Sequence, residues 1–137
     1  KQDIGTLKQL RIPTNDTETE FKNQILNLAL VLVDRINEKE IINELPSTKE
    51  NKGSIAKLEL FLLHHSYPHT ERDVSLLRKI QKLRSRIAAH ASGSKGQEYL
   101  AKELGNQSYR DYFLELLWSG VTTLDDLITF SKNKANT

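Results

Sequence analysis

Apolar residues recur every three or four positions through most of the chain, which is the spacing of one face of an α-helix. The first series follows Thr17 and Glu20, whose types and spacing are typical of a capping box. This pattern predicts a helix that runs to about Glu38, with Pro46 beyond its end. The apolar positions of this helix are Phe21, Ile25, Leu28, Leu32 and Ile36.

Two further helices are predicted in the middle of the chain. One begins between Ser47 and Ser54 and is closed by Pro68. The next begins at Thr70 and Asp73, which again resemble a capping box, and runs towards His90. Its apolar positions are Val74, Leu77, Ile80, Leu83 and Ile87.

The last third of the chain predicts a break, a short helix and a long helix. Small residues from 92 to 96 predict the break, and a helix from Glu98 to Leu104 is expected to end at Gly105. Ser108 with Asp111 predicts the start of the last helix. We assign its apolar and aromatic residues to the core, with Tyr109 as the most exposed aromatic. They are Tyr112, Phe113, Leu116, Leu117, Trp118, Val121, Leu124, Leu127 and Ile128.

No segment alternates apolar and polar residues as a strand does, and no Asn-Gly or Asp-Gly pair marks a hairpin. Amphipathic helices joined by short loops favour an all-α fold, an antiparallel bundle of four long helices plus a short one. We expect an N-terminal arm over residues 1–16, the bundle over 17–132 and a disordered tail over 133–137.

Composition excludes several kinds of chemistry. The 137 residues, enough for one domain, include no cysteine, and therefore no disulfide, thiol nucleophile or thiolate metal site. No apolar run could span a membrane and no signal peptide is recognisable, so we expect no membrane partner and a cytoplasmic location. Residue 1 is Lys, and other domains of a larger protein are therefore expected. His64, His65 and His69 invite a zinc site, but Pro68 breaks their helical register, and we expect no metal or cofactor.

The net charge of +2 hides an uneven distribution. No acidic residue stands between Asp73 and Glu98, whereas six basic residues do. The stretch from Asp16 to Glu44 has the opposite bias, with seven acids against three bases. The basic block could attract phosphates, or it could form a basic helix beside an acidic one within the same bundle. Its members are Arg78, Lys79, Lys82, Arg84, Arg86 and Lys95.

Two polar residues of the third predicted helix fall within its apolar arc or at its edge. At about 100° per residue, Arg84 lies about 40° from Ile80 on one side, and His90 lies about 80° from it on the other. A guanidinium that faces inward requires a carboxylate partner, such as Asp34 or Asp125, or a wet cleft. His90, in the last turn, could equally well cap its own helix end.

The segment Leu83-Arg-Ser-Arg-Ile-Ala-Ala-His90 resembles the signature of HEPN (higher eukaryotes and prokaryotes nucleotide-binding) domains. In that signature, an Arg and a following polar residue precede a His within one helix of an all-α bundle. Here five residues separate Arg84 from His90, and Ser85 is the polar residue. Most of the chain, from the first predicted helix to the last, would be covered by the resemblance.

The resemblance implies a metal-independent endoribonuclease that acts as a homodimer, in a toxin or an antiviral defence protein. Two Arg–His motifs would face each other across a two-fold axis and bind RNA. His90 would act as general base or acid, and Arg84 would stabilise the charge on the phosphate. Ser85 could orient the substrate or His90, while Arg86, Lys82 and Lys95 would contact the RNA backbone.

Two other interpretations remain open. HEPN domains that have lost catalysis serve as RNA-binding or dimerisation modules of larger proteins. The chain could also be a plain helical scaffold in which Arg84 is held in an ion pair. Some HEPN toxins carry a Tyr two residues after the His as the target of an inactivating enzyme. Ser92 stands there in this chain, so that form of control is not expected.

Overall fold

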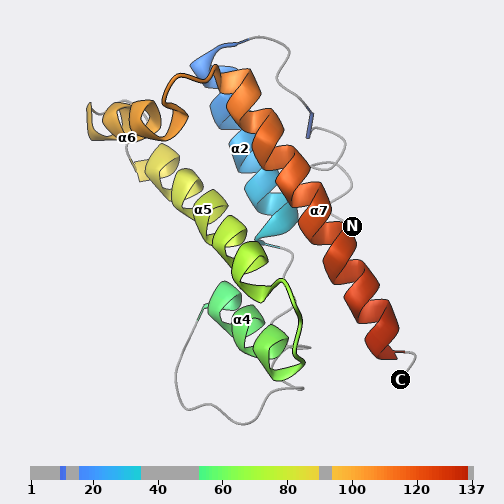
Figure 1. Cartoon of the computed structure of the whole chain (residues 1–137). Helices are drawn as coiled ribbons and strands as arrows, with labels where there is room; N and C mark the ends of the chain where they lie inside the picture. The colour runs from blue at the N-terminus through green and yellow to red at the C-terminus, as the bar shows by residue number, and fades with distance from the viewer. Residues whose placement is uncertain (1–9, 12–15, 35–52, 90–93, 136–137) are drawn as a thin grey trace.

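The computed structural model describes residues 10–11, 16–34, 53–89 and 94–135, and every regular element among them is an α-helix. These helices are α2 (Glu18–Leu32), α4 (Ser54–His64), α5 (Thr70–Ala89), α6 (Ser94–Leu104) and α7 (Tyr109–Ala135). Helix α5 packs against each of the other four, and α2 also packs against α7 (Figure 1). The expected all-helical class is confirmed for the described residues, in which α4 and α6 are both only 11 residues long.

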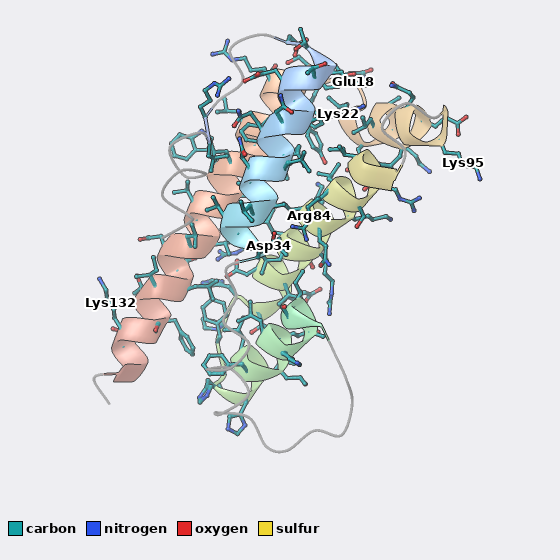
Figure 2. The ribbon with its side chains drawn as sticks, turned by 180° about the vertical axis from the view of Figure 1, so that it is seen from behind. Glu18, Lys22, Asp34, Arg84, Lys95 and Lys132 are labelled. Atoms are coloured by element: carbon teal, nitrogen blue, oxygen red, sulfur yellow. The ribbon has the colours of Figure 1, made fainter. Side chains whose placement is uncertain are left out.

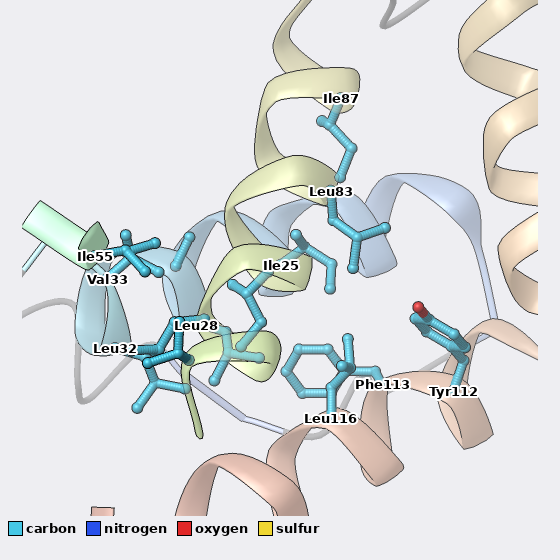
Figure 3. Packing of buried hydrophobic residues seen from close by; sticks show 14 of the residues in the cluster. Ile25, Leu28, Leu32, Val33, Ile55, Leu83, Ile87, Tyr112, Phe113 and Leu116 are labelled. Carbon is cyan, nitrogen blue, oxygen red and sulfur yellow. The ribbon is translucent and has the colours of Figure 1, made fainter. Parts of the chain in front are cut away.

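The core lies where α2, α5 and α7 meet (Figure 3). The apolar positions predicted for the first and third helices are buried over the described part of each helix. Gly120 of α7 allows the close approach of α2, because a Cβ atom there would lie 2.8 Å from Cδ1 of Leu32. The largest fully buried apolar side chains are Phe21, Phe113, Ile25, Leu28, Leu62, Ile80, Leu83 and Val74.

Local signals fix several helix ends as expected. Thr17 accepts a hydrogen bond from the amide of Glu20 at the start of α2. The Ser108 hydroxyl likewise accepts from the amide of Asp111 at the start of α7. Gly105, with a φ of +59°, follows the last residue of α6. Helix α2 ends at Leu32 with Val33 as its C-cap, so it stops earlier than the expected run to about Glu38, while Glu38 and Pro46 themselves lie outside the described residues.

The start of α5 is built differently from the expected capping box. The Thr70 hydroxyl donates to the carbonyl of Tyr67 instead of accepting from Asp73. The Asp73 carboxylate is fully buried, and it accepts hydrogen bonds from the Tyr67 hydroxyl, the Thr123 hydroxyl and Nε of Arg72. Thr123 belongs to α7, so the Asp73 carboxylate links the first turn of α5 to α7 and does not cap α5.

Helix α6 begins earlier than expected, at Ser94, so residues 94–96 are helical and do not belong to a break. Helix α7 extends to Ala135, and part of the expected tail is therefore helical as well. Residues 10–11 of the expected arm lie against α2. There the Arg11 amide donates to the buried Gln24 side chain, and the Arg11 guanidinium pairs with Glu20.

The core assignment fails along the second half of α7. Val121, Leu124 and Ile128 are 48%, 39% and 51% exposed, and Trp118 is 64% exposed. The side of α7 that faces the core carries Gly120 and Thr123 beyond Leu116, and both are buried. A helix holds one direction only at a period of 3.6 residues, and the exposed four lie about 80–200° from Leu116 on that wheel. Apolar character alone misassigned them.

Candidate functional site

Arg84 extends from α5 towards the end of α2 and forms an ion pair there (Figure 2). Its Nη1 donates to both carboxylate oxygens of Asp34, each at a distance of 2.7 Å. The Arg84 side chain is 28% exposed and that of Asp34 is 38% exposed, so the pair is accessible to solvent. Within the part of the chain that the structure describes, Nε and Nη2 of Arg84 have no hydrogen-bond partner. Asp34 is one of the two carboxylate partners that the sequence left open.

A hollow of about 400 Å³ lies beside this ion pair. It is walled by the end of α2, the first turn of α4 and the middle of α5. Both partners of the ion pair line it, together with a second arginine and the side chain of Gln81. The lining residues are Val33, Asp34, Gly53, Ser54, Ile55, Ala56, Arg78, Gln81 and Arg84.

The hollow has the chemistry of an anion site with one competing carboxylate. The positive end of the α4 dipole opens onto it, and Gly53 caps that helix without a side-chain hydrogen bond. Arg78 contributes a second guanidinium, whose Nη2 donates to Glu59 at 3.0 Å on the exposed surface. A phosphate group could use the remaining donors of Arg84 while Nη1 stays on Asp34.

The structure places the expected RNA-contacting residues on a different face of α5. The Lys82 Nζ and the Arg86 guanidinium lie 5.5 Å and 5.4 Å from the centre of the Tyr99 ring, on α6. Nearby, the Lys79 Nζ lies 5.6 Å from the centre of the Tyr112 ring, on α7. We call Lys79, Lys82 and Arg86 the basic ridge.

Two aromatic rings support the basic ridge. Burial, and then the charge of Glu103, raise the pKa of Tyr99, while Arg86 opposes this shift. Burial, and then a hydrogen bond from the Tyr112 hydroxyl to Glu103, raise the pKa of Tyr112. Both rings therefore stay neutral at ordinary pH and present a π-face to a cation. Sequence reasoning missed Tyr99 because no local pattern relates it to α5.

The remaining expected site residues are less closely placed. Ser85 is exposed on α5, and Lys95 is exposed near the start of α6 (Figure 2). His90 lies outside the described residues, which reach Ala89 at the end of α5. The structure thus brings Lys82 and Arg86 together but separates both from Arg84, which points towards α2.

The histidines near Pro68 lie at the end of α4 and the turn that follows. The rings of His64 and His65 are 4.9 Å apart, and the ring of His69 lies 5.7 Å from that of Tyr67. Across the described ranges, no group of three His, Cys, Asp or Glu side chains is placed to hold a metal ion. None of the described helices combines the length and the apolar character needed to cross a membrane.

Comparison with known proteins adds no relative, because no family model, no curated protein and no solved structure matches the chain. The site must therefore be interpreted from its own geometry.

Proposed function

We propose that this chain is an RNA-directed domain of the HEPN type that cleaves RNA without a metal ion. In this proposal the helices form an antiparallel bundle of four long helices plus a short one, and the domain acts in the cytoplasm as part of a toxin or antiviral defence protein. Arg84 and His90 form the catalytic pair, and two copies of the pair face each other across a dimer cleft.

The reaction needs only groups that this chain carries. His90 removes the proton of an RNA 2′-hydroxyl, and the resulting oxygen attacks the adjacent phosphorus. The bond from phosphorus to the 5′-oxygen breaks, leaving a 2′,3′-cyclic phosphate, and the 5′-oxygen takes up a proton from a protonated His90. Arg84 stabilises the charge that develops on the non-bridging phosphate oxygens.

The environment of Arg84 is the observation that supports this proposal most. Its guanidinium is held by one nitrogen, and its other two nitrogens bind no side chain among the described residues, at the wall of a hollow of about 400 Å³. Arginine carries five N–H donors in a fixed fork, so a guanidinium held in this way can still donate to a phosphate. Asp34 then acts as a positioning residue that orients Arg84 before the phosphate enters.

The basic ridge supports the RNA part of the proposal. Lys79, Lys82 and Arg86 would contact successive phosphates in a way that does not depend on base sequence and weakens with salt. Because the ridge and Arg84 lie on different faces of α5, one phosphate cannot contact both. The RNA would have to pass around α5, with the scissile phosphate in the hollow.

A non-catalytic RNA-binding or dimerisation module is the second candidate, and the ion pair favours it. With Nη1 of Arg84 on both oxygens of Asp34, part of the charge that catalysis would need is already neutralised. In this candidate RNA contacts the basic ridge alone.

The deciding experiment measures cleavage of a fluorescent single-stranded RNA in EDTA. We expect His90→Ala and Arg84→Ala each to lower the rate at least 100-fold, which is the lower range for a lost acid–base or transition-state contact. Arg110→Ala is the matched control, because it also removes one arginine but from an exposed position on α7, outside the hollow and the basic ridge. Its rate should stay within about threefold of the parent rate, since exposed side chains away from a site have small effects.

Each alternative outcome has a meaning. Cleavage that is equally fast in all variants would contradict the assignment of Arg84 and His90. RNA binding without cleavage in the parent chain, weakened by Lys82→Glu but not by Arg84→Ala, would establish the second candidate.

A further inference from the structure

The outer face of α7 carries a line of residues that no other described helix covers. Trp118, Val121 and Ile128 are about half exposed or more, and Leu114 continues the line towards the start of the helix. On a helical wheel centred on Leu114, these residues lie within about 40° of its direction. Asp125 lies in the middle of the same line, and Lys132 lies at its far end. At its start, Asp111 and Arg110 flank the line about 60° to one side and about 40° to the other. We call this line, from Asp111 to Lys132, the α7 stripe.

Scattered exposed apolar residues are normal on a protein surface, but a continuous line along one helix indicates an interface. Leu63 on α4 is an isolated example of the first kind. The stripe also borders a shallow hollow of about 560 Å³ beside Trp118, lined by Asp111, Leu114 and Glu115. A partner that binds the α7 stripe must therefore present a line of apolar side chains, with a charged side chain opposite each end of the stripe.

We propose that the α7 stripe binds the same stripe of a second copy of this chain, with the two helices antiparallel around a two-fold axis. A two-fold interface pairs each residue i with a residue j and each j with i. When the axis passes between Val121 and Thr122, Asp111 faces Lys132 of the second copy, and Lys132 faces its Asp111.

The same register satisfies the middle of the stripe. Trp118 faces Asp125 of the second copy, where the indole N–H can donate to the carboxylate. Ile128 of the second copy reaches the level of Leu114 and Glu115, and so can fill the hollow beside Trp118. Both apolar and charged positions of the stripe thus gain a partner of suitable chemistry.

Other arrangements of two copies place like charges together. A parallel pair brings each residue opposite itself, so that Asp111, Asp125 and Lys132 all face their own kind. Shifting the antiparallel pair by one heptad places Asp111 opposite Asp125 in one direction, and Asp125 opposite Asp125 in the other. Like charges in direct contact disfavour an interface by several kcal/mol. Among these arrangements, charge favours the antiparallel pair whose axis passes between Val121 and Thr122.

The size of the stripe predicts a weak association. The stripe is about 32 Å long at 1.5 Å per residue and about 10 Å wide. Such a strip buries roughly 640 Å² over both copies, which is below the area of about 1,000 Å² expected for a stable specific interface and fits only a weak, transient one. The association should therefore depend on concentration, with self-association appearing between about 10 μM and about 1 mM, the range expected for a weak interface.

The α7 interface shares no residue with the hollow at Arg84, which is lined from α2, α4 and α5. It is thus separate from the facing of two Arg84–His90 motifs in the proposed function. Neither proposal depends on the other.

Analytical ultracentrifugation of the full chain tests the interface. We expect Trp118→Glu to raise the dissociation constant at least tenfold, since a central Trp is a common hot spot. The mean mass at a given concentration should then move towards half that of the parent assembly. Leu63→Glu is the matched control, because Leu63 is 59% exposed but lies outside the stripe.

Charge swaps test the register. Asp111→Lys alone places two Lys pairs in the interface, and Lys132→Asp alone places two Asp pairs there, so both should weaken self-association. An equimolar mixture of the two variants restores two opposite-charge contacts, and its association should return to the parent level. A parent chain that stays monomeric at about 1 mM would overturn the proposal, given that weak specific interfaces still associate there. Failure of the mixture to recover association would overturn the register.

Separate readouts keep the two proposals distinguishable. Trp118→Glu should leave the affinity for RNA unchanged in salt-matched binding assays, and Arg84→Ala should leave self-association through α7 unchanged. If Arg84→Ala lost association while Trp118→Glu kept it, the copies would meet at the Arg84 face and not through α7, which would contradict the α7 proposal.

Discussion

Helix α5 carries an arginine–aspartate contact near each of its ends, and the two contacts differ in what surrounds the carboxylate. Near the start, Asp73 is fully buried and accepts hydrogen bonds from three side chains of α5, α7 and the preceding turn. Near the other end, Asp34 is 38% exposed and faces a single nitrogen of Arg84 beside a hollow.

The difference separates a structural contact from one that can take part in binding. A buried carboxylate must be matched by donors because its desolvation is costly, and Asp73 has them. An exposed pair has little effect on stability, so Asp34 and Arg84 could separate or share donors with a ligand at small cost. Three predictions test this contrast, from the largest expected effect to the smallest.

Asp73→Ala should give the largest loss of stability among these carboxylate variants. It would leave the Tyr67 and Thr123 hydroxyls and Nε of Arg72 without their shared acceptor, two of them buried. Leaving two buried hydroxyl donors without an acceptor costs about 1–3 kcal/mol each, so we expect a loss of about 2–6 kcal/mol. Urea unfolding followed by circular dichroism measures the change as a lower midpoint with an unchanged slope.

Asp126→Asn is the control for that prediction. Asp126 pairs with Nη2 of the same arginine, Arg72, but its side chain is 33% exposed. Its replacement should cost less than about 1 kcal/mol, as for exposed pairs. Equal losses in the two variants would mean that burial does not distinguish the two carboxylates.

Asp34→Asn should alter RNA binding more than stability. The amide keeps the size of the carboxylate but removes its charge, so Arg84 becomes fully available to a phosphate. We expect an increase in RNA affinity of about threefold to tenfold, and a loss of stability below about 1 kcal/mol. Filter binding at fixed salt measures the affinity.

Glu59→Gln, at the Arg78 pair, is the matched control for Asp34→Asn. It also removes one negative charge near the hollow, and a general charge effect would raise affinity equally in both variants. Equal increases in RNA affinity in the two variants would mean that Arg84 has no specific role in binding the phosphate. A loss of stability of several kcal/mol in Asp34→Asn would instead make this pair as structural as Asp73.

The contrast between the two ends of α5 also shows what the sequence could predict. Helix starts at Thr17 and Ser108 were predictable because a cap depends on residues three positions apart. The three donors of Asp73 were not, because Thr123 comes from a helix 50 residues away. An aspartate in a first helical turn looks like a cap until its tertiary partners are known.

The candidate site was predictable only in part, for the same reason. At about 100° per residue, Lys82 lies about 160° from Arg84 on a helical wheel, and the structure has the two side chains on different faces of α5. That wheel already contained the signal that the residues grouped by the HEPN resemblance would not form one cluster. The choice between Asp34 and Asp125 as the partner of Arg84 depended on helix packing, which periodicity does not give.

A third carboxylate, Glu18 at the start of α2, should show the smallest effect and the most direct dependence on pH. A hydrogen bond from Lys22 lowers the pKa of Glu18 below its ordinary value, and Gln97 and Tyr109 also donate to it, while burial opposes the shift. A lowered pKa in the folded state contributes stability above the unfolded pKa, and that stability is lost as the pH falls through the folded pKa. Because the side chain is 29% exposed, we expect only a few tenths of a kcal/mol between pH 6 and pH 3. Comparison of urea midpoints for the parent and Glu18→Gln across that range isolates this contribution. A difference between the two that stays constant with pH would show that Glu18 acts through packing and not through its charge.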